Sequence, residues 1–208
     1  MARSTRILRK DAKTKDRRIP VIISIALILT SLIACSPDNG NAGGEGISDS
    51  GNVAIVYFSA TGNTERVAGY IADETGGSLI EIIPADPYSN ADLDWTNNSS
   101  RVNEEHNNYD TVRPGIQNDI DLSGYDTVFL GYPLWWGEAP AIVLTFLDNE
   151  DLSGKTIIPF CTSSSSQIGD SASNLENYEG NGNWLDGRRF RSGASENSVR
   201  TWLQGLGY

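Results

Sequence analysis

Short apolar runs alternate with amphipathic stretches from residue 53 to the C-terminus. Mostly apolar runs of this length predict the strands of a parallel sheet, and they occupy residues 53–58, 79–83, 127–132 and 156–161. The continuous apolar run at 53–58 predicts a central strand buried on both faces. Apolar positions at helical spacing predict helices at residues 65–75, 140–146 and 195–206, with one more near 100–107. This alternation predicts a doubly wound α/β sheet with helices on both faces.

The N-terminal part of the chain does not follow this pattern. Residues 1–34 combine eight basic side chains with an apolar run at 19–34, which is the layout of a secretory signal peptide. The run is shorter than the roughly 20 residues that a membrane-spanning helix needs. It ends at Leu32-Ile33-Ala34-Cys35, which resembles the lipobox of bacterial lipoproteins. We expect an extracytoplasmic protein, anchored to a bacterial membrane by lipidation of Cys35, and an uncleaved anchor is the alternative.

Residues 35–51 are rich in Gly, Ser, Asn and Asp, and this composition predicts a flexible tether. The folded domain is therefore expected at residues 52–208. Residues 1–34 hold eight of the 16 Lys and Arg residues and two of the 27 Asp and Glu residues, so the formal charge of residues 35–208 is −17. Such an acidic chain is not expected to bind nucleic acid, because phosphate contacts require clustered Lys and Arg.

Polar residues follow the first predicted strand, at the sheet edge where doubly wound proteins bind ligands. They are Ser59, Ala60, Thr61, Gly62, Asn63 and Thr64. Free backbone N–H groups at a helix N-terminus attract anions. The segment lacks the Lys of nucleoside triphosphate loops, so it suits a phosphate monoester. The alternative is that Thr61 or Asn63 simply caps the helix.

Two further segments follow the third and fourth predicted strands. The first contains adjacent indoles and consists of Pro133, Leu134, Trp135, Trp136 and Gly137. Indoles on a loop suit a planar aromatic ligand, although one of the two tryptophans is also expected to pack in the core. The second is a hydroxyl-rich run whose small polar groups can reach the edge of a heteroaromatic ring: Thr162, Ser163, Ser164, Ser165 and Ser166.

In this order, the three segments resemble the flavodoxin family, in particular its bacterial branch with a Trp-Trp-Gly second loop. The resemblance runs from about residue 53 to the C-terminus. It implies a flavodoxin-like five-stranded parallel sheet in the order 2-1-3-4-5, with FMN bound where the strand order reverses. It further implies that residues 59–64 hold the FMN phosphate, that Trp135 or Trp136 covers the isoalloxazine ring, and that residues 162–165 line the other edge of the ring.

The chain departs from this family pattern in its third loop. Relatives commonly carry glycines where this chain has Ser163 to Ser166, so any position there that needs a positive φ is expected to be strained or rearranged. The loop also lacks the aromatic residue with which many short flavodoxins cover the second flavin face. One face is therefore expected to stay open to a substrate or a redox partner.

Three functions remain open at the level of sequence. The first is an FMN electron carrier for a redox partner protein or a small-molecule acceptor, without catalytic residues. The second is an FMN-dependent reductase of quinones or other acceptors that oxidises a nicotinamide, and the open flavin face favours it. The domain has few basic residues to attract an anionic dinucleotide, but Arg188, Arg189 and Arg191 offer local positive charge. The third is a binding module that has lost FMN.

Two single residues bear on the choice among these functions. His106 is the sole histidine and lies in a polar stretch, so it is expected to be solvated rather than catalytic. Cys161 ends an apolar run and is expected to be a small core residue rather than a reactive thiol. No role follows from the sequence for residues 84–120, although several of them resemble what this branch of the family carries there.

Overall fold

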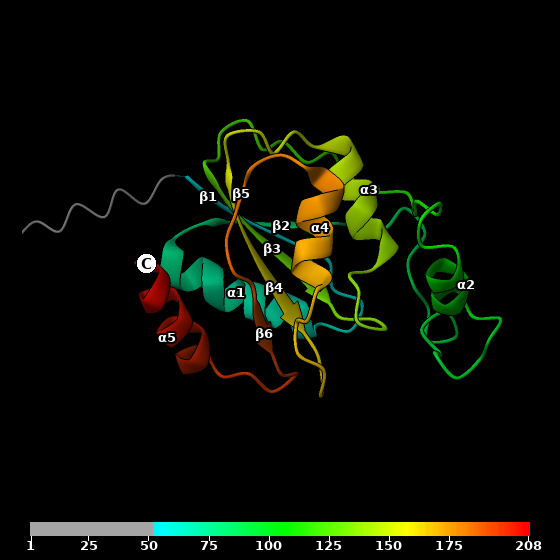
Figure 1. Ribbon diagram of the computed structural model, residues 1–208. Coiled ribbons are helices and arrows are strands. Elements are labelled where there is room, and N and C mark those ends of the chain that lie inside the picture. The colour runs from blue at the N-terminus through cyan, green and yellow to red at the C-terminus, as the bar shows by residue number, and fades with distance from the viewer. Residues whose placement is uncertain (1–51) are drawn as a thin grey trace, which may run out of the picture. The chain divides into compact units, whose positions relative to one another are not determined.

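A parallel β-sheet organises residues 52–208, the part of the chain that the computed structural model describes (Figure 1). The expected signal peptide, the lipidation site Cys35 and the tether 35–51 lie outside the described residues. The elements follow one another as β1 Val53–Tyr57, α1 Asn63–Thr75, β2 Ser78–Glu81, α2 Arg101–Asn107, β3 Thr127–Pro133, α3 Ala141–Asn149, β4 Thr156–Thr162, α4 Ser171–Glu179, β5 Asn183–Trp184, β6 Arg188–Phe190 and α5 Glu196–Leu206. No helix among these is long and apolar enough to cross a membrane.

The strands pair in the order β2-β1-β3-β4-β5, and every pairing is parallel. The doubly wound fold and the strand order predicted from the sequence are confirmed. In the central pair, Ile55 of β1 lies opposite Phe129 of β3, and Phe129 lies opposite Ile158 of β4. All three side chains are buried, as expected for strands covered on both faces.

Alternate residues of the strands pack into two cores, one on each face of the sheet. Val56 and Leu130 belong to the core that α3 and α4 cover, whereas Ile55 and Phe129 belong to the core that α1 and α5 cover. The helices contribute apolar faces to these cores, as in the Val199, Trp202 and Leu203 face of α5. The period of two along each strand separates the two layers.

The fifth strand position is divided between two short strands, β5 and β6, which pair with the start and the end of β4. The division lies opposite Pro159. Leu185 donates its backbone N–H to the carbonyl of Ile157 at 2.9 Å, so alternate residues of β4, Pro159 included, face this edge of the sheet. Because proline has no N–H to donate, the ladder is interrupted there.

The predicted helices and strands agree with the structure to within a few residues at their ends. Helix α1 begins at Asn63, two residues before the expected start, and Pro140 immediately precedes α3 instead of lying in its first turn. Ser195 caps α5 by accepting a hydrogen bond from the backbone N–H of Ser198, as expected. The sequence pattern missed α4, because Ser171 and Leu175 are its only buried residues.

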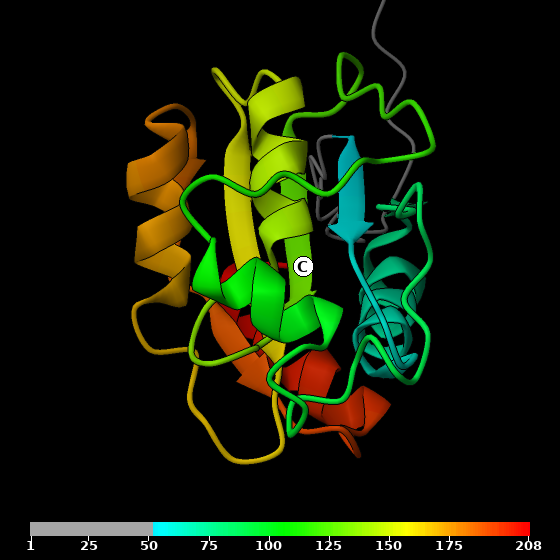
Figure 2. The ribbon, with the colours of Figure 1, turned by 90° about the vertical axis from the view of Figure 1, so that its right-hand side faces the viewer.

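A lobe built around α2 projects from the main body of the domain (Figures 1 and 2). We define the α2 lobe as residues 84–116. It is closed at its base by an antiparallel bridge between Pro84 and Ile116 and by a 2.8 Å hydrogen bond from the backbone N–H of Ala85 to the carbonyl of Gly115. The lobe lies between β2 and β3 in the chain and carries the helix expected near residues 100–107.

Candidate functional site

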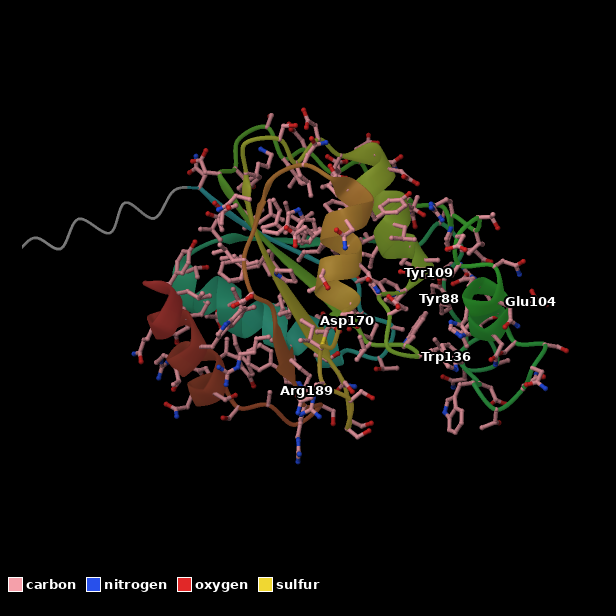
Figure 3. All side chains as sticks on the ribbon, viewed as in Figure 1. Tyr88, Glu104, Tyr109, Trp136, Asp170 and Arg189 are labelled. Atoms are coloured by element: carbon pink, nitrogen blue, oxygen red, sulfur yellow. The ribbon has the colours of Figure 1, made fainter. Side chains whose placement is uncertain are left out.

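The carboxyl ends of β1, β3 and β4 lie side by side, because the strands are parallel and adjacent. This brings three segments together: the first loop, residues 59–64; the second loop, residues 133–137; and the third loop, residues 162–166. These are the segments that the sequence singled out. In Figure 3 the labelled Trp136 marks the second loop, between the sheet and the α2 lobe that carries Tyr88 and Glu104.

The first loop presents unused hydrogen-bond donors at the start of α1. Gly62 precedes the helix with a φ of 76°, and no side chain caps the helix. Within the described chain, none of the backbone N–H groups of residues 59–65 donates to another backbone or side-chain group. Asn63 donates to the hydroxyl of Thr61 at 3.1 Å and accepts from Arg66 at 2.9 Å. Thr61 and Asn63 therefore do not cap α1, and its N–H groups are left for a ligand.

Ser59 adds a second unused polar group to the first loop. Its hydroxyl oxygen is buried and has no hydrogen-bond partner within the described residues. A buried hydroxyl without a partner is costly. An anion at the start of α1 would satisfy this hydroxyl together with the free N–H groups, and it would also interact favourably with the helix dipole.

Thr64 and Thr162 face each other instead of the open site. Their hydroxyl oxygens lie 2.8 Å apart, and both residues are buried. The pair joins the first loop to the third loop. Neither residue lines the cavity described below, so the pair supports the site from within the protein.

A tight turn builds the second loop. Trp135 and Glu138 exchange backbone hydrogen bonds of 2.9 Å each, and Trp136 and Gly137 between them have φ angles of 49° and 88°. Two successive positive φ angles are those of a type I′ hairpin turn. The turn sets the two neighbouring indoles in different surroundings, since Trp136 lies at its tip and Trp135 at its base.

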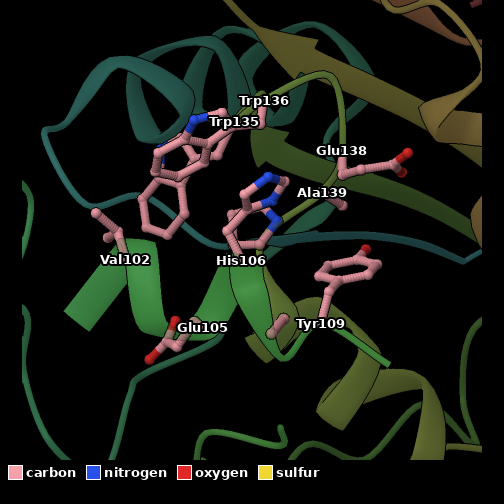
Figure 4. Close-up of a pocket in the computed structure, with 10 residues that line it drawn as sticks. Val102, Glu105, His106, Tyr109, Trp135, Trp136, Glu138 and Ala139 are labelled. Atoms are coloured by element: carbon pink, nitrogen blue, oxygen red, sulfur yellow. The ribbon is translucent and has the colours of Figure 1, made fainter. Parts of the chain in front are cut away.

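Trp135 packs against the core and Trp136 faces outward. The Trp135 indole meets the rings of Phe58 and Tyr88 edge-on, with centroids 5.8 Å and 5.7 Å away. Trp136 is 44% exposed, and its indole stacks on the imidazole of His106, with centroids 4.7 Å apart and planes at 11° (Figure 4). His106 is exposed, as expected, but it also supports an aromatic residue of the site, which the sequence did not indicate.

The third loop accommodates its serines without left-handed backbone. Among the described residues, Trp136 is the only one other than glycine with a positive φ, so Ser163 to Ser166 are rearranged and not strained. Arg189 of β6 holds the loop by donating to the carbonyl oxygens of Ser166 at 2.9 Å and Ser165 at 2.7 Å. The fifth strand position, divided as described above, thus positions the third loop.

A cavity of about 390 Å³ lies where the three loops and the α2 lobe meet. Its size is in the range of small-molecule and cofactor sites. The expected residues that line it are Ala60, Thr61, Pro133, Leu134, Trp135, Trp136 and Ser164. The other expected residues do not line it and lie in the loops around it: Ser59, Gly62, Asn63, Thr64, Gly137, Thr162, Ser163 and Ser165. Three residues of the α2 lobe, for which no role followed from the sequence, also line the cavity: Leu93, Trp95 and Val102.

A buried polar cluster fixes the α2 lobe beside this cavity. The Glu105 carboxylate accepts hydrogen bonds from Arg101 at 2.6 Å and from the Tyr88 hydroxyl at 2.8 Å. The Arg101 guanidinium also lies 3.8 Å from the centroid of the Tyr88 ring. Burial, and then the neighbouring Glu105 carboxylate, raise the pKa of Tyr88. Because Tyr88 contacts Trp135, the cluster connects the lobe to the second loop.

Acidic groups dominate the electrostatics of the described domain, which has 22 Asp and Glu residues against eight Lys and Arg residues. Beside the first loop, burial and the carboxylates of Glu81 and Glu65 raise the pKa of Tyr57 to about 12. Burial also raises the pKa of the Cys161 thiol to about 12. Cys161 is fully buried, which confirms it as a core residue.

Comparisons with known proteins agree with this architecture. The family model for flavodoxin matches residues 52–206. Two solved structures of proteins provisionally described as flavoproteins, from Bacteroides eggerthii and Bacteroides uniformis, are 42% and 40% identical to this chain, with TM-scores of 0.70 and 0.71. Their alignments cover 76% and 74% of this chain and 98% of each relative.

A more distant solved structure shares the fold. It is a flavoprotein in complex with FMN from Lactobacillus acidophilus, 23% identical with a TM-score of 0.51, and the alignment covers 73% of this chain and 98% of that protein. No curated protein matches the chain.

Proposed function

The chain belongs to the flavodoxin family, and on that basis we propose that it binds FMN in the cavity between the three loops and transfers electrons as a carrier. The main support for the proposal comes from the structure of the first loop. Its free N–H groups and the unpartnered Ser59 hydroxyl suit a phosphate, and they border a cavity walled by aromatic side chains. The Lactobacillus acidophilus flavoprotein, whose fold is similar, was solved with FMN.

The residues of the chain bind and shield the cofactor in this proposal. The first loop holds the phosphate through backbone N–H groups and Ser59, and Trp135 and Trp136 cover the ring and exclude water. FMN supplies the redox chemistry when bound. The acidic side chains of the domain disfavour the negative charge that reduction adds, so they lower the reduction potential of the bound cofactor.

A carrier needs no catalytic acid or base. His106 stacks on Trp136, and the Cys161 thiol is buried. The alternative, a reductase that oxidises a nicotinamide, would use the positive charge near Arg188, Arg189 and Arg191. Arg189 already donates to two carbonyl oxygens of the third loop. Fewer of its N–H groups are therefore free to bind the phosphates of a dinucleotide.

The experiment that tests cofactor binding is a titration of the apo-protein with FMN, riboflavin and FAD, followed by flavin fluorescence. FMN is expected to bind tightly and riboflavin much more weakly, because riboflavin lacks the phosphate. Failure to bind any flavin would reject the proposal and favour a binding module without FMN. Steady-state NADH and NADPH oxidation then separates the two redox functions, since a carrier turns over negligibly without a partner reductase.

We further propose that the domain is held outside the cytoplasm by a lipid on Cys35. The basic and apolar residues 1–34, the Leu-Ile-Ala-Cys junction and the polar tether 35–51 support this proposal. Metabolic labelling with a radioactive fatty acid tests it in a bacterial host. The wild-type chain is expected to incorporate label and to fractionate with membranes, and Cys35→Ser is expected to lose the label.

A further inference from the structure

Trp95 is a large indole in a polar part of the α2 lobe, and it lines the same cavity as Trp135 and Trp136. Its side chain is 70% exposed, the largest exposed fraction among the large hydrophobic residues of the described chain. An exposed indole on a cavity rim loses contact with water when a ligand covers it, and this favours binding of a planar aromatic group.

The backbone of Trp95 is fixed in spite of this exposure. Its N–H donates to the carbonyl of Leu93 at 2.9 Å, and its carbonyl accepts from the Asn103 side chain at 3.0 Å. Asn103 also donates to the carbonyl of Asn97 at 2.9 Å and to the hydroxyl of Ser100 at 3.0 Å. The turn that carries Trp95 is thus attached to α2, and its backbone has a defined place at the rim of the cavity.

Helix α2 is in turn attached to the body of the domain. Within the lobe, the backbone N–H of Val102 donates to the carbonyl of Asp92 at 3.1 Å, and the Val102 side chain is buried and lines the cavity. The cluster of Glu105, Arg101 and Tyr88 joins the helix to Trp135 through ring contact. The cavity therefore has two walls, one from the three loops and one from the α2 lobe.

We propose that Trp95 contacts the flavin ring directly and forms the second aromatic wall of the cofactor site. This inference rests on the proposed FMN binding. The third loop has no aromatic residue that could cover the second face of the flavin ring. In this proposal the covering residue comes instead from the α2 lobe, between β2 and β3. The flavin face that the sequence left open is then shielded by Leu93 and Trp95.

The test compares Trp95→Ala, Trp95→Phe and the control Leu79→Ala for binding of FMN and riboflavin. Leu79 is 46% exposed on β2 and does not line the cavity. Loss of one aromatic stacking contact is expected to weaken binding about tenfold. Both ligands carry the ring, so Trp95→Ala should weaken FMN and riboflavin by the same factor. Trp95→Phe should retain affinity within about threefold, because a ring remains.

A second readout is the fluorescence of the bound flavin. A tryptophan in contact with the ring quenches its emission, so the residual emission of bound FMN should rise in Trp95→Ala and stay unchanged in Leu79→Ala. Equal affinity and equal emission in Trp95→Ala and the control would overturn the inference. A loss of affinity for FMN but not for riboflavin would also overturn it, because the effect would then act on the phosphate.

The same experiment separates this inference from the proposed function. If the wild-type protein binds FMN and the Trp95→Ala variant binds it with the same affinity and emission, only the role of Trp95 is rejected. Wild-type protein that binds no flavin rejects the FMN proposal itself.

Discussion

The hydroxyl oxygens of Thr64 and Thr162 lie 2.8 Å apart in a buried hydrogen bond that joins the first turn of α1 to the last residue of β4. Ninety-eight positions separate the two residues in the chain. The bond holds the first and third loops at a set spacing beneath the cavity. The two loops therefore form one site, and their relative position depends on a pair of hydroxyls.

Replacement of Thr64 by Val is expected to destabilise the apo-protein by about 1–2 kcal/mol, because the Thr162 hydroxyl is left buried without a partner. The double variant Thr64→Val/Thr162→Val should recover part of this loss, since neither hydroxyl remains. Urea unfolding measures both effects. The control is Thr201→Val, whose exposed hydroxyl donates to the carbonyl of Asn197 on α5. Equal midpoints for Thr64→Val and this control would contradict the expectation.

Replacement of Ser59 by Ala is expected to leave the apo-protein at least as stable as the wild type, because the Ser59 hydroxyl is buried and has no partner to lose. The affinity for FMN should fall by about tenfold to a hundredfold, the effect of one hydrogen bond to a charged group. Riboflavin binding should not change. Calorimetric titration and thermal unfolding give the two quantities, and a clear drop in apo-protein stability would show that the hydroxyl has a structural role instead.

Replacement of Gly137 by Ala is expected to cost about 1 kcal/mol of stability, because φ at this position is 88° and side chains disfavour that region. A Cβ atom at Gly137 would meet nothing within 4 Å, so the cost comes from the backbone alone. Gly193 provides the matched control, since it has equal space and no positive φ. If Gly137→Ala and Gly193→Ala unfold at the same denaturant concentration, the type I′ turn is not under the inferred constraint.

Replacement of Glu105 by Gln is expected to destabilise the protein by about 1–3 kcal/mol, because Arg101 loses the carboxylate that pairs with it in a largely buried site. The exposed neighbour Glu104, replaced by Gln, serves as the control. Tyr88→Phe removes one hydrogen bond and should cost less. Chemical unfolding of the three variants ranks these effects, and an equal response of Glu105→Gln and Glu104→Gln would argue against anchoring by the cluster.

The ion pair of Asp148 predicts a dependence of stability on pH. Hydrogen bonds from Tyr178 and Arg113 hold the pKa of the Asp148 carboxyl below its ordinary value of 3.8. A carboxyl whose pKa is lower in the folded state stabilises above its ordinary pKa, and this contribution disappears as the pH falls through the folded value. The stability difference between wild type and Asp148→Asn should therefore be largest near neutral pH.

Unfolding curves from about pH 7 to about pH 2 measure this difference, and the two proteins should converge at the acid end. The difference should also shrink in high salt, because the Asp148 side chain is 42% exposed and exposed charges are screened. A difference that stays constant with pH would show that packing, and not charge, accounts for the effect of the substitution.

Local patterns in the sequence were sufficient for the main strands and for most helices. The continuous apolar runs at β1, β3 and β4 identify buried parallel strands, because both faces of such strands contact helices. Element α4 and the short strands β5 and β6 lack such a signal. Leu175 is the one large buried residue of α4, and the division of the fifth strand position depends on Pro159 in the neighbouring strand.

The sequence also indicated which loops form the site, because the carboxyl ends of parallel strands meet at one edge of the sheet. Only the tertiary structure decided how individual side chains are used there. Thr64 bonds to Thr162, Trp135 packs on Phe58 and Tyr88, and Trp136 stacks on His106. Each of these contacts joins residues from different elements, so no spacing along the chain reveals them.

The placement of Trp95 has the same physical origin. In the sequence it is a single indole among polar residues, without helical or strand periodicity around it. The fold brings it to the cavity because the α2 lobe is closed at its base and is attached to the domain through Tyr88, whose ring contacts Phe58 and Trp135. Local chemistry determines secondary structure and loop composition, whereas contacts between distant segments, which depend on packing, determine which residues share a site.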